Sequence, residues 1–255
     1  MFGRNRSFSN KGCDCVKTLG IIGGLGPMAT AYLLQLVIEM TDAKTDQEHL
    51  DVIVFDRPSV PDRTAYILDK AKPSPLPSMT ATAKTLEQLG AGCLCAPCVT
   101  SHYFYKELSS SVSVPFLNMV EETAKELKTA GKQRPGILAT TGTVSTGLFQ
   151  KAFEKEGLQA VLPDEAGQAL VMSLIYDDIK AGKPADPEKF QKVSEMLYSS
   201  GCDCIVLGCT ELSLIKKSAG LDGRYLDALE VLAKRCVEEC GAPLKAGYQK
   251  LLGKA

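Results

Sequence analysis

Two cysteines stand at places in the sequence where a reactive thiol is expected. Cys98 ends the apolar run GCLCAPC, and Cys209 follows the apolar run CIVLG in the second half of the chain. Each precedes a stretch with helical character, SHYFYKELSS in the first case and ELSLIKKSAG in the second. A thiol at a helix N-terminus is expected to have a lowered pKa, because the exposed N–H groups favour the thiolate. Both cysteines are therefore predicted to do acid–base or nucleophilic chemistry.

Most of the other cysteines fit buried structural positions better than a metal site. Cys93 and Cys95 are two apart in a predicted strand, so both side chains point to one face of the sheet. Zinc sites usually show CxxC pairs on turns instead. Similar spacing arguments predict packed thiols at four further positions, Cys202, Cys204, Cys236 and Cys240. We therefore expect no metal site.

His102 is four residues beyond Cys98 and would lie on the same face of a helix. Its imidazole could support a thiolate at Cys98. Alternatively, it could hydrogen-bond a backbone carbonyl, because a half-buried polar ring needs a partner. The sequence leaves both roles open.

The composition is that of a globular protein without a strongly charged partner. Of 255 residues, 45% are hydrophobic, and 29 basic residues against 30 acidic ones leave a formal charge of −1. No long-range field would attract nucleic acid or anionic lipid, so a small molecule or a protein is the expected partner. The uncharged segment 19–38 is interrupted by glycines and Pro27, which argues against a membrane span.

The N-terminal segment and the thiols together predict a cytoplasmic protein. Residues 1–16 are polar, carry three basic residues and have no apolar centre, so we expect a flexible tail rather than a signal peptide. The chain has ten cysteines, and thiols persist in the reducing cytosol.

Short apolar runs alternate with amphipathic segments along the chain. The runs predict strands at 17–24, 50–56, 92–98, 135–143, 160–163 and 204–212. The amphipathic segments predict helices at 28–40, 81–89, 148–157 and 189–200. This alternation is typical of parallel sheets covered by helices on both faces, so the predicted fold class is α/β.

The two halves of this pattern are similar to each other. When Gly90 is set against Gly201, Cys98 aligns with Cys209 without a gap. We therefore predict two similar α/β units facing one another. Because ligands of such sheets bind beyond the carboxyl ends of the strands, both thiols are expected to face one cleft.

A glycine-rich turn follows the first predicted strand, in GIIGGLGPMAT. It lacks the G-x-G-x-x-G spacing of a dinucleotide-binding turn. Glycines with Pro27 at a helix start bring backbone N–H groups to the cleft, which is a good environment for a carboxylate. Gly24, inside this turn, is therefore a candidate substrate-binding residue.

Five motifs, IGGLGPMAT, PDRTAYIL, APCVTSH, LATTGT and LGCTEL, together resemble the aspartate/glutamate racemase family, and within it the aspartate racemases. They occur in the family's order and span residues 17–232. The resemblance implies an amino-acid racemase without pyridoxal phosphate or another cofactor. It also implies a homodimer, a small acidic amino acid as substrate, and two pseudo-symmetric, flavodoxin-like domains with the active site in the cleft between them.

The same resemblance assigns domain boundaries and site residues. The first domain would cover 17–115, completed by a C-terminal return at 226–255, and the second would cover 116–225. Cys98 and Cys209 would be the catalytic pair, and Arg63 would hold the side-chain carboxylate of the substrate. Further candidate substrate-binding residues are Thr100, Ser101, Thr141, Tyr176, Lys180, Thr210 and Glu211.

Two positions depart from the family pattern. Val99 stands where an asparagine is usual after the first cysteine, and Arg57 stands where an asparagine is usual before the PDRT motif. Val99 removes a hydrogen-bond donor and Arg57 adds a cation, so both are candidate specificity residues. Alternatively, Val99 only packs and Arg57 points to solvent. Aspartate is the first expected substrate, followed by glutamate or cysteate.

The presence of two matched thiols supports racemisation on chemical grounds. Racemisation removes a Cα proton from one face and returns a proton to the other, so it needs two acid–base groups on opposite sides. A single cysteine would suit a decarboxylase or an isomerase that forms a covalent adduct. A redox protein would need the two Cα atoms within about 7 Å of each other. A binding module on this fold would retain the cleft and lose one of the thiols.

Overall fold

Two three-stranded parallel sheets form the centre of the structure, a computed structural model that describes residues 16–221 and 223–253. The first sheet has the order β2-β1-β3 and consists of β1 (Leu19–Gly23), β2 (Val52–Asp56) and β3 (Cys93–Cys95). The second has the order β4-β5-β6 and consists of β4 (Pro135–Leu138), β5 (Cys204–Leu207) and β6 (Tyr225–Asp227). The predicted α/β class with parallel sheets is confirmed. Nearly all of the predicted tail, with Cys13 and Cys15, lies outside the described residues.

The second sheet differs from the prediction at its edges. The predicted strand at 160–163 contributes only a single bridge, between Val161 and Gly136. This run is short and ends in Pro163, which has no N–H to donate to a neighbouring strand. The third place in the sheet is taken by β6, which pairs with β5. β6 ends in the polar Asp227 and leads directly into α11, so it forms no separate apolar run and the sequence did not indicate this strand.

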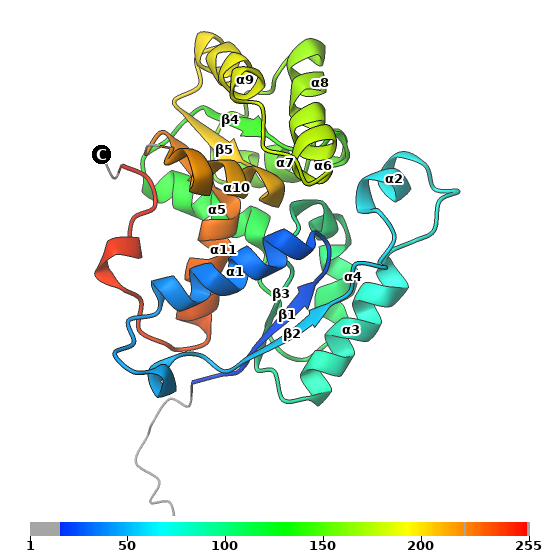
Figure 1. The fold of residues 1–255 in the computed structure, drawn as a ribbon, viewed down its shortest axis with the longest axis vertical. Helices are drawn as coiled ribbons and strands as arrows, with labels where there is room; N and C mark the ends of the chain where they lie inside the picture. Colours follow the sequence, from blue (N-terminus) through cyan, green and yellow to red (C-terminus); the bar gives the residue numbers. More distant parts are fainter. Residues whose placement is uncertain (1–15, 222, 254–255) are drawn as a thin grey trace, which may run out of the picture.

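Helices connect the strands and cover the sheets (Figure 1). The first half contains α1 (Pro27–Met40), α2 (Arg63–Leu68), α3 (Leu76–Gln88), α4 (Tyr105–Ser110) and α5 (Met119–Thr129). The second half contains α6 (Thr141–Thr146), α7 (Leu148–Lys155), α8 (Glu165–Ser173), α9 (Pro187–Ser199), α10 (Thr210–Ala219) and α11 (Ala228–Glu239). Shorter turns are the 3₁₀ segments η1 (Asp46–Glu48), η2 (Val99–Phe104) and η4 (Ala246–Tyr248), and the π-helical segment η3 (Leu174–Ile179).

A continuous apolar core joins the two halves of the chain. The C-terminal helix α11 packs against both α1 and α5 (Figure 1). The same cluster of buried side chains includes Leu33 of α1, Leu232 of α11 and Val206 of β5. Helix α11 also brings Cys236 and Cys240 into this cluster, beside the thiols of β3. The predicted buried role of these cysteines is confirmed.

Within the described part of the chain, no helix combines the length and the apolar character that a membrane crossing needs. The domain boundaries, 17–115 with 226–255 and 116–225, stay predictions. The homodimer and the cytoplasmic location also stay predictions.

Candidate active site

The two cysteines singled out from the sequence lie beyond the carboxyl ends of two parallel strands. Cys98 follows β3 and immediately precedes η2, while Cys209 follows β5 and immediately precedes α10. Both side chains are buried, with 7% of Cys98 and 6% of Cys209 exposed. The structure places both in the wall of one small cavity, which we name the inner chamber. One thiol comes from each half of the chain.

The inner chamber has a volume of about 10 Å³, close to the space that one water molecule needs. Its wall combines the two thiols with a guanidinium, an ammonium and several hydroxyl groups. The lining residues are Leu25, Asp62, Arg63, Thr64, Cys98, Val99, Thr100, Thr140, Tyr176, Lys180, Cys209, Thr210 and Glu211. The expected substrate, an amino acid, is larger than this volume, so the chamber must widen for it to bind.

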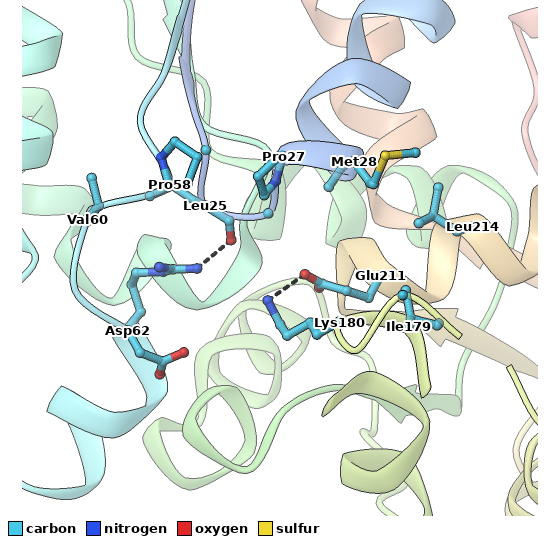
Figure 2. A pocket seen from close by; sticks show the side chains of 15 residues that line it. Leu25, Pro27, Met28, Pro58, Val60, Asp62, Ile179, Lys180, Glu211 and Leu214 are labelled. Atoms are coloured by element: carbon cyan, nitrogen blue, oxygen red, sulfur yellow. Dashed lines mark hydrogen bonds and ion pairs between the residues drawn. The ribbon is translucent and has the colours of Figure 1, made fainter. Parts of the chain in front are cut away.

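A second cavity, of about 620 Å³, adjoins the inner chamber, and we name it the outer cavity. Figure 2 shows Lys180 and Glu211 from the second half of the chain facing Asp62 and Leu25 from the first. The residues that line both cavities are Leu25, Asp62, Arg63, Lys180 and Glu211. These five residues form the boundary between the outer cavity and the thiols.

Glu211 links Lys180 to the thiol of Cys209. Its Oε1 lies 2.6 Å from the Nζ of Lys180, and its Oε2 accepts the thiol hydrogen of Cys209 at 2.9 Å. The hydroxyl of Thr210 lies 3.5 Å from the same Oε2. A Cβ on Gly26 would come within 2.8 Å of Oε1, so a larger residue there would require the carboxylate to shift. Burial disfavours the charge of Lys180, but Glu211 outweighs burial and raises the pKa of Lys180.

The pKa of Cys209 is raised, whereas its position at a helix N-terminus predicted a lowered pKa. Burial is the largest cause, and the negative charge of Glu211 adds to it. Lys180 and the backbone N–H groups act in the opposite direction, with smaller effects. The sequence-based prediction is wrong for this thiol because desolvation outweighs the helix dipole. At neutral pH Cys209 is therefore a neutral thiol.

Replacing Glu211 with glutamine is expected to lower the pKa of Cys209, because the substitution removes a negative charge that opposes the thiolate. The measurement is the pH dependence of Cys209 alkylation by iodoacetamide, followed by mass spectrometry in a Cys98→Ser background. The midpoint of alkylation should lie at a lower pH in the double variant Cys98→Ser, Glu211→Gln than in Cys98→Ser alone. A midpoint that stays in place or moves to higher pH would rule out this role of the carboxylate.

Arg63 is the buried cation on the Cys98 side of the chamber. It donates hydrogen bonds to the backbone oxygens of Leu25 and Pro61, the second at 3.3 Å. Its Nε is buried and has no hydrogen-bond partner among the described residues. Burial disfavours the charge of Arg63, but the neighbouring Cys98 sulfur raises its pKa. An unused buried donor on a fixed cation is a position where a carboxylate could bind.

Tyr176 reaches from η3 to the first half of the chain. Its hydroxyl donates to the Oδ2 of Asp62 at 3.4 Å, and the Oδ1 of Asp62 caps α2 by accepting from the N–H of Ala65. Burial raises the pKa of Tyr176. The Nζ of Lys180 lies 5.6 Å from the centre of the Tyr176 ring. Asp62 belongs to the PDRT motif, of which only the arginine was predicted as a site residue.

Hydroxyl groups from both halves form a connected cluster at one wall of the chamber. The Oγ1 of Thr100 lies 3.0 Å from the Oγ1 atoms of both Thr140 and Thr143. Thr64 donates to Thr140 at 3.4 Å. Of these threonines, only Thr100 was predicted from the sequence. A threonine pair three apart at the start of a helix, as in Thr140 and Thr143, is a capping pattern that could have indicated them.

Thr141, the threonine predicted at this position, lines neither cavity. Its N–H donates to the Sδ of Met172 at 3.2 Å, and its hydroxyl accepts from Gln168 at 3.4 Å. Thr140 is the N-cap of α6, where its hydroxyl accepts from the N–H of Thr143, and it lines the inner chamber. The structure therefore brings Thr140, rather than its neighbour, to the thiols.

Ser101 and His102 hold the turn that carries Cys98. The Ser101 hydroxyl donates to the backbone oxygen of Cys98 at 2.6 Å, and Nδ1 of His102 bonds the same oxygen at 3.0 Å. The Nε2 of His102 accepts from the N–H of Met119 at 3.1 Å. Burial lowers the pKa of His102. Of the two roles left open for this histidine, the backbone contact is the one observed.

The last three predicted residues differ in their access to the cavities. Val99 is buried and lines the inner chamber. Gly24 lines the outer cavity with a φ of +82°, and its N–H is already donated to Thr30 at 3.0 Å. Arg57 is exposed, lines neither cavity and contacts Thr82 at 3.4 Å. In the described part of the chain, no group of three or more His, Cys, Asp or Glu side chains is arranged to hold a metal ion.

A family model described as Asp/Glu/Hydantoin racemase matches residues 22–236. Among solved structures, the Picrophilus torridus aspartate racemase is 30% identical to this chain, with a TM-score of 0.78. That match covers 92% of this chain and 99% of the other. The predicted racemase fold is confirmed.

Two further relatives extend the comparison. An aspartate racemase homologue from Pyrococcus horikoshii OT3 is 23% identical, with a TM-score of 0.72 over 88% of this chain and 99% of that chain, and it shows a similar fold. The broad specificity amino-acid racemase RacX of Bacillus subtilis (strain 168) is 26% identical over 228 residues. These residues are 86% of this chain and 96% of that protein.

Proposed function

Because the chain belongs to the Asp/Glu/hydantoin racemase family and is a cofactor-independent amino-acid racemase, we propose that it interconverts L- and D-aspartate with Cys98 and Cys209 as its acid–base pair. The observation that carries this proposal is that both thiols line one inner chamber from opposite halves of the chain. Two such groups in the wall of one chamber match a reaction that needs two acid–base groups, one for each face of Cα.

The protonation state of Cys209 supports a division of roles. Cys209 is a neutral thiol bonded to Glu211, which is the form that gives up a proton. In one direction of the racemisation, the Cys98 thiolate removes the Cα proton, and the Cys209 thiol gives its own proton to the opposite face of Cα. Cys98 then holds the proton and Cys209 is the thiolate. The reverse direction starts from this state, with Cys98 protonated and Cys209 as the thiolate.

Stabilisation of the carbanion without a cofactor depends on hydrogen-bond donors around the α-carboxylate. We assign this role to hydroxyls in the chamber wall, from Thr100, Thr140 and Thr210. The backbone N–H groups at the starts of η2 and α10 lie beside the two cysteines and add donors of fixed orientation. These groups are in place before the charge develops.

We assign the side-chain carboxylate of the substrate to Arg63 and Lys180. The unused Nε of Arg63 supplies one donor, and Lys180 would exchange Glu211 for the incoming carboxylate. Aspartate is the preferred assignment because the aspartate racemase of Picrophilus torridus is 30% identical over nearly the whole chain. Glutamate and cysteate are the alternatives. Val99 remains a candidate specificity residue, whereas the exposed position of Arg57 favours a solvent-facing role.

A substrate panel tests the proposed function. The purified enzyme is incubated with each enantiomer of aspartate, glutamate, cysteate and alanine, with no pyridoxal phosphate added, and the products are separated by chiral chromatography. Aspartate is expected to have the highest kcat/KM, and alanine a much lower one, because alanine has no group for the two cations. Heat-denatured enzyme is the control. Racemisation of the other amino acids without aspartate would reject the assignment.

A further inference from the structure

The outer cavity is much larger than an acidic amino acid requires. Its volume of about 620 Å³ lies within the range of about 300–1,000 Å³ found for sites that enclose drug-sized ligands. It begins at Arg63 and Lys180, which also line the inner chamber. The outer cavity therefore continues the path along which a substrate side chain would leave the two thiols.

Apolar groups form slightly more than half of the walls of the outer cavity. Figure 2 shows side chains from both halves of the chain around it. The apolar lining includes Leu25, Pro27, Met28, Val60, Ile179 and Leu214. Met28 is 66% exposed, so most of this side chain is in contact with water. An apolar ligand group that covers such a wall removes its surface from water, which is favourable.

The charged groups at the floor of the outer cavity balance one another. Arg63 and Lys180 supply two positive charges, and Asp62 and Glu211 supply two negative charges. Lys180 is paired with Glu211 at 2.6 Å, and Asp62 accepts from Tyr176 and caps α2. A floor without net charge, whose carboxylates already have partners, does not exclude an uncharged side chain.

We propose that the outer cavity is a side-chain subsite through which the enzyme also racemises neutral amino acids with long, unbranched apolar side chains. This subsite rests on the proposed two-thiol chemistry in the inner chamber. The Cα of such a substrate lies between the thiols, and its side chain passes Lys180 and covers Met28 and Leu214. With a neutral substrate Lys180 keeps Glu211 as its partner, and only an acidic substrate displaces that carboxylate.

A homologous series of neutral amino acids tests the subsite in the parent enzyme. The substrates are 2-aminobutyrate, norvaline, norleucine and 2-aminoheptanoate, and kcat/KM is measured by chiral chromatography with aspartate in parallel. Burial of each added methylene is expected to raise kcat/KM about three- to fourfold once the chain reaches the apolar wall. The parent enzyme is used throughout this series, so its outcome does not depend on the folding of any variant.

Met28→Ser provides the matched test of the wall, because it replaces an exposed apolar side chain at the start of α1. The ratio of kcat/KM for norleucine to that for aspartate should fall at least about threefold. Ile38→Ser is the control, because Ile38 is an exposed apolar residue of the same helix that does not line the outer cavity. The ratio should stay unchanged in this control.

The results separate the subsite from the proposed aspartate activity. If aspartate is racemised but kcat/KM for the neutral amino acids stays constant or falls with side-chain length, the subsite is overturned and the proposed function stays intact. A rising series without aspartate turnover would support the subsite and overturn the choice of aspartate. An equal loss in Met28→Ser and Ile38→Ser would also overturn the subsite, because a cavity wall and a remote surface position would then be equivalent. No turnover of any substrate would contradict both proposals.

Discussion

Serine in place of Cys98 or Cys209 is expected to abolish the interconversion of aspartate enantiomers, with kcat lowered by about 100- to 10,000-fold. Each thiol is proposed to exchange protons on one face of Cα, so the loss of either one leaves one face without its acid–base group. A serine hydroxyl has nearly the same size but is a far weaker acid than a thiol. Turnover is measured by chiral chromatography from each enantiomer separately.

Isotope exchange distinguishes a lost acid–base group from a damaged fold. In deuterated water, each single variant should still exchange the Cα proton of one enantiomer, because the remaining thiol serves its own face. Cys202→Ser is the matched control: it makes the same chemical change at a buried cysteine outside both cavities and should keep full turnover. Full racemisation by either active-site variant would disprove the two-thiol mechanism.

Alanine in place of Arg63 is expected to lower kcat/KM for aspartate by about 10- to 100-fold. A charge-assisted hydrogen bond contributes about 1.5–3 kcal/mol. The buried Nε of Arg63 has no partner among the described residues, so it is free to donate such a bond to the substrate. The loss of kcat/KM in Arg63→Ala should be much smaller when free alanine is the substrate, because this substrate has no side-chain carboxylate. Steady-state kinetics on both substrates give the two ratios.

The Arg63 variant also needs a control for folding. Arg63 donates to the backbone oxygens of Leu25 and Pro61, so its removal disturbs the turn before α2 as well as the proposed contact with substrate. Arg63→Lys keeps the positive charge but loses the fork of donors, and an intermediate kcat/KM is expected. Thermal unfolding shows which variants keep the fold. An equal loss on aspartate and alanine would assign Arg63 a structural role only.

Local patterns in the sequence were sufficient to predict the parallel sheets and the helices α1, α3, α7 and α9. The alternation of apolar runs and amphipathic segments depends on near neighbours in the chain, and it indicated β1, α1 and β2 at close to their observed bounds. The strand predicted at 204–212 is shorter in the structure, because β5 ends at Leu207 and α10 begins at Thr210. The positions of Cys98 and Cys209 followed from the same information. Each directly follows a strand, and the carboxyl ends of parallel strands are where such sheets bind their ligands. The short strand β6 was not predicted, because it leads directly into α11 and forms no separate apolar run.

The sequence by itself thus determined the fold class and the two thiols, while only the tertiary structure decided how the chamber around them is built. It selected Thr140 rather than Thr141 for the chamber wall, and it brought Tyr176 to Asp62 and Lys180 to Glu211. It also reversed the expected pKa shift of Cys209. These contacts join residues that are distant in the sequence, and the pKa of a thiol depends on desolvation by the whole surrounding structure, which no local pattern contains.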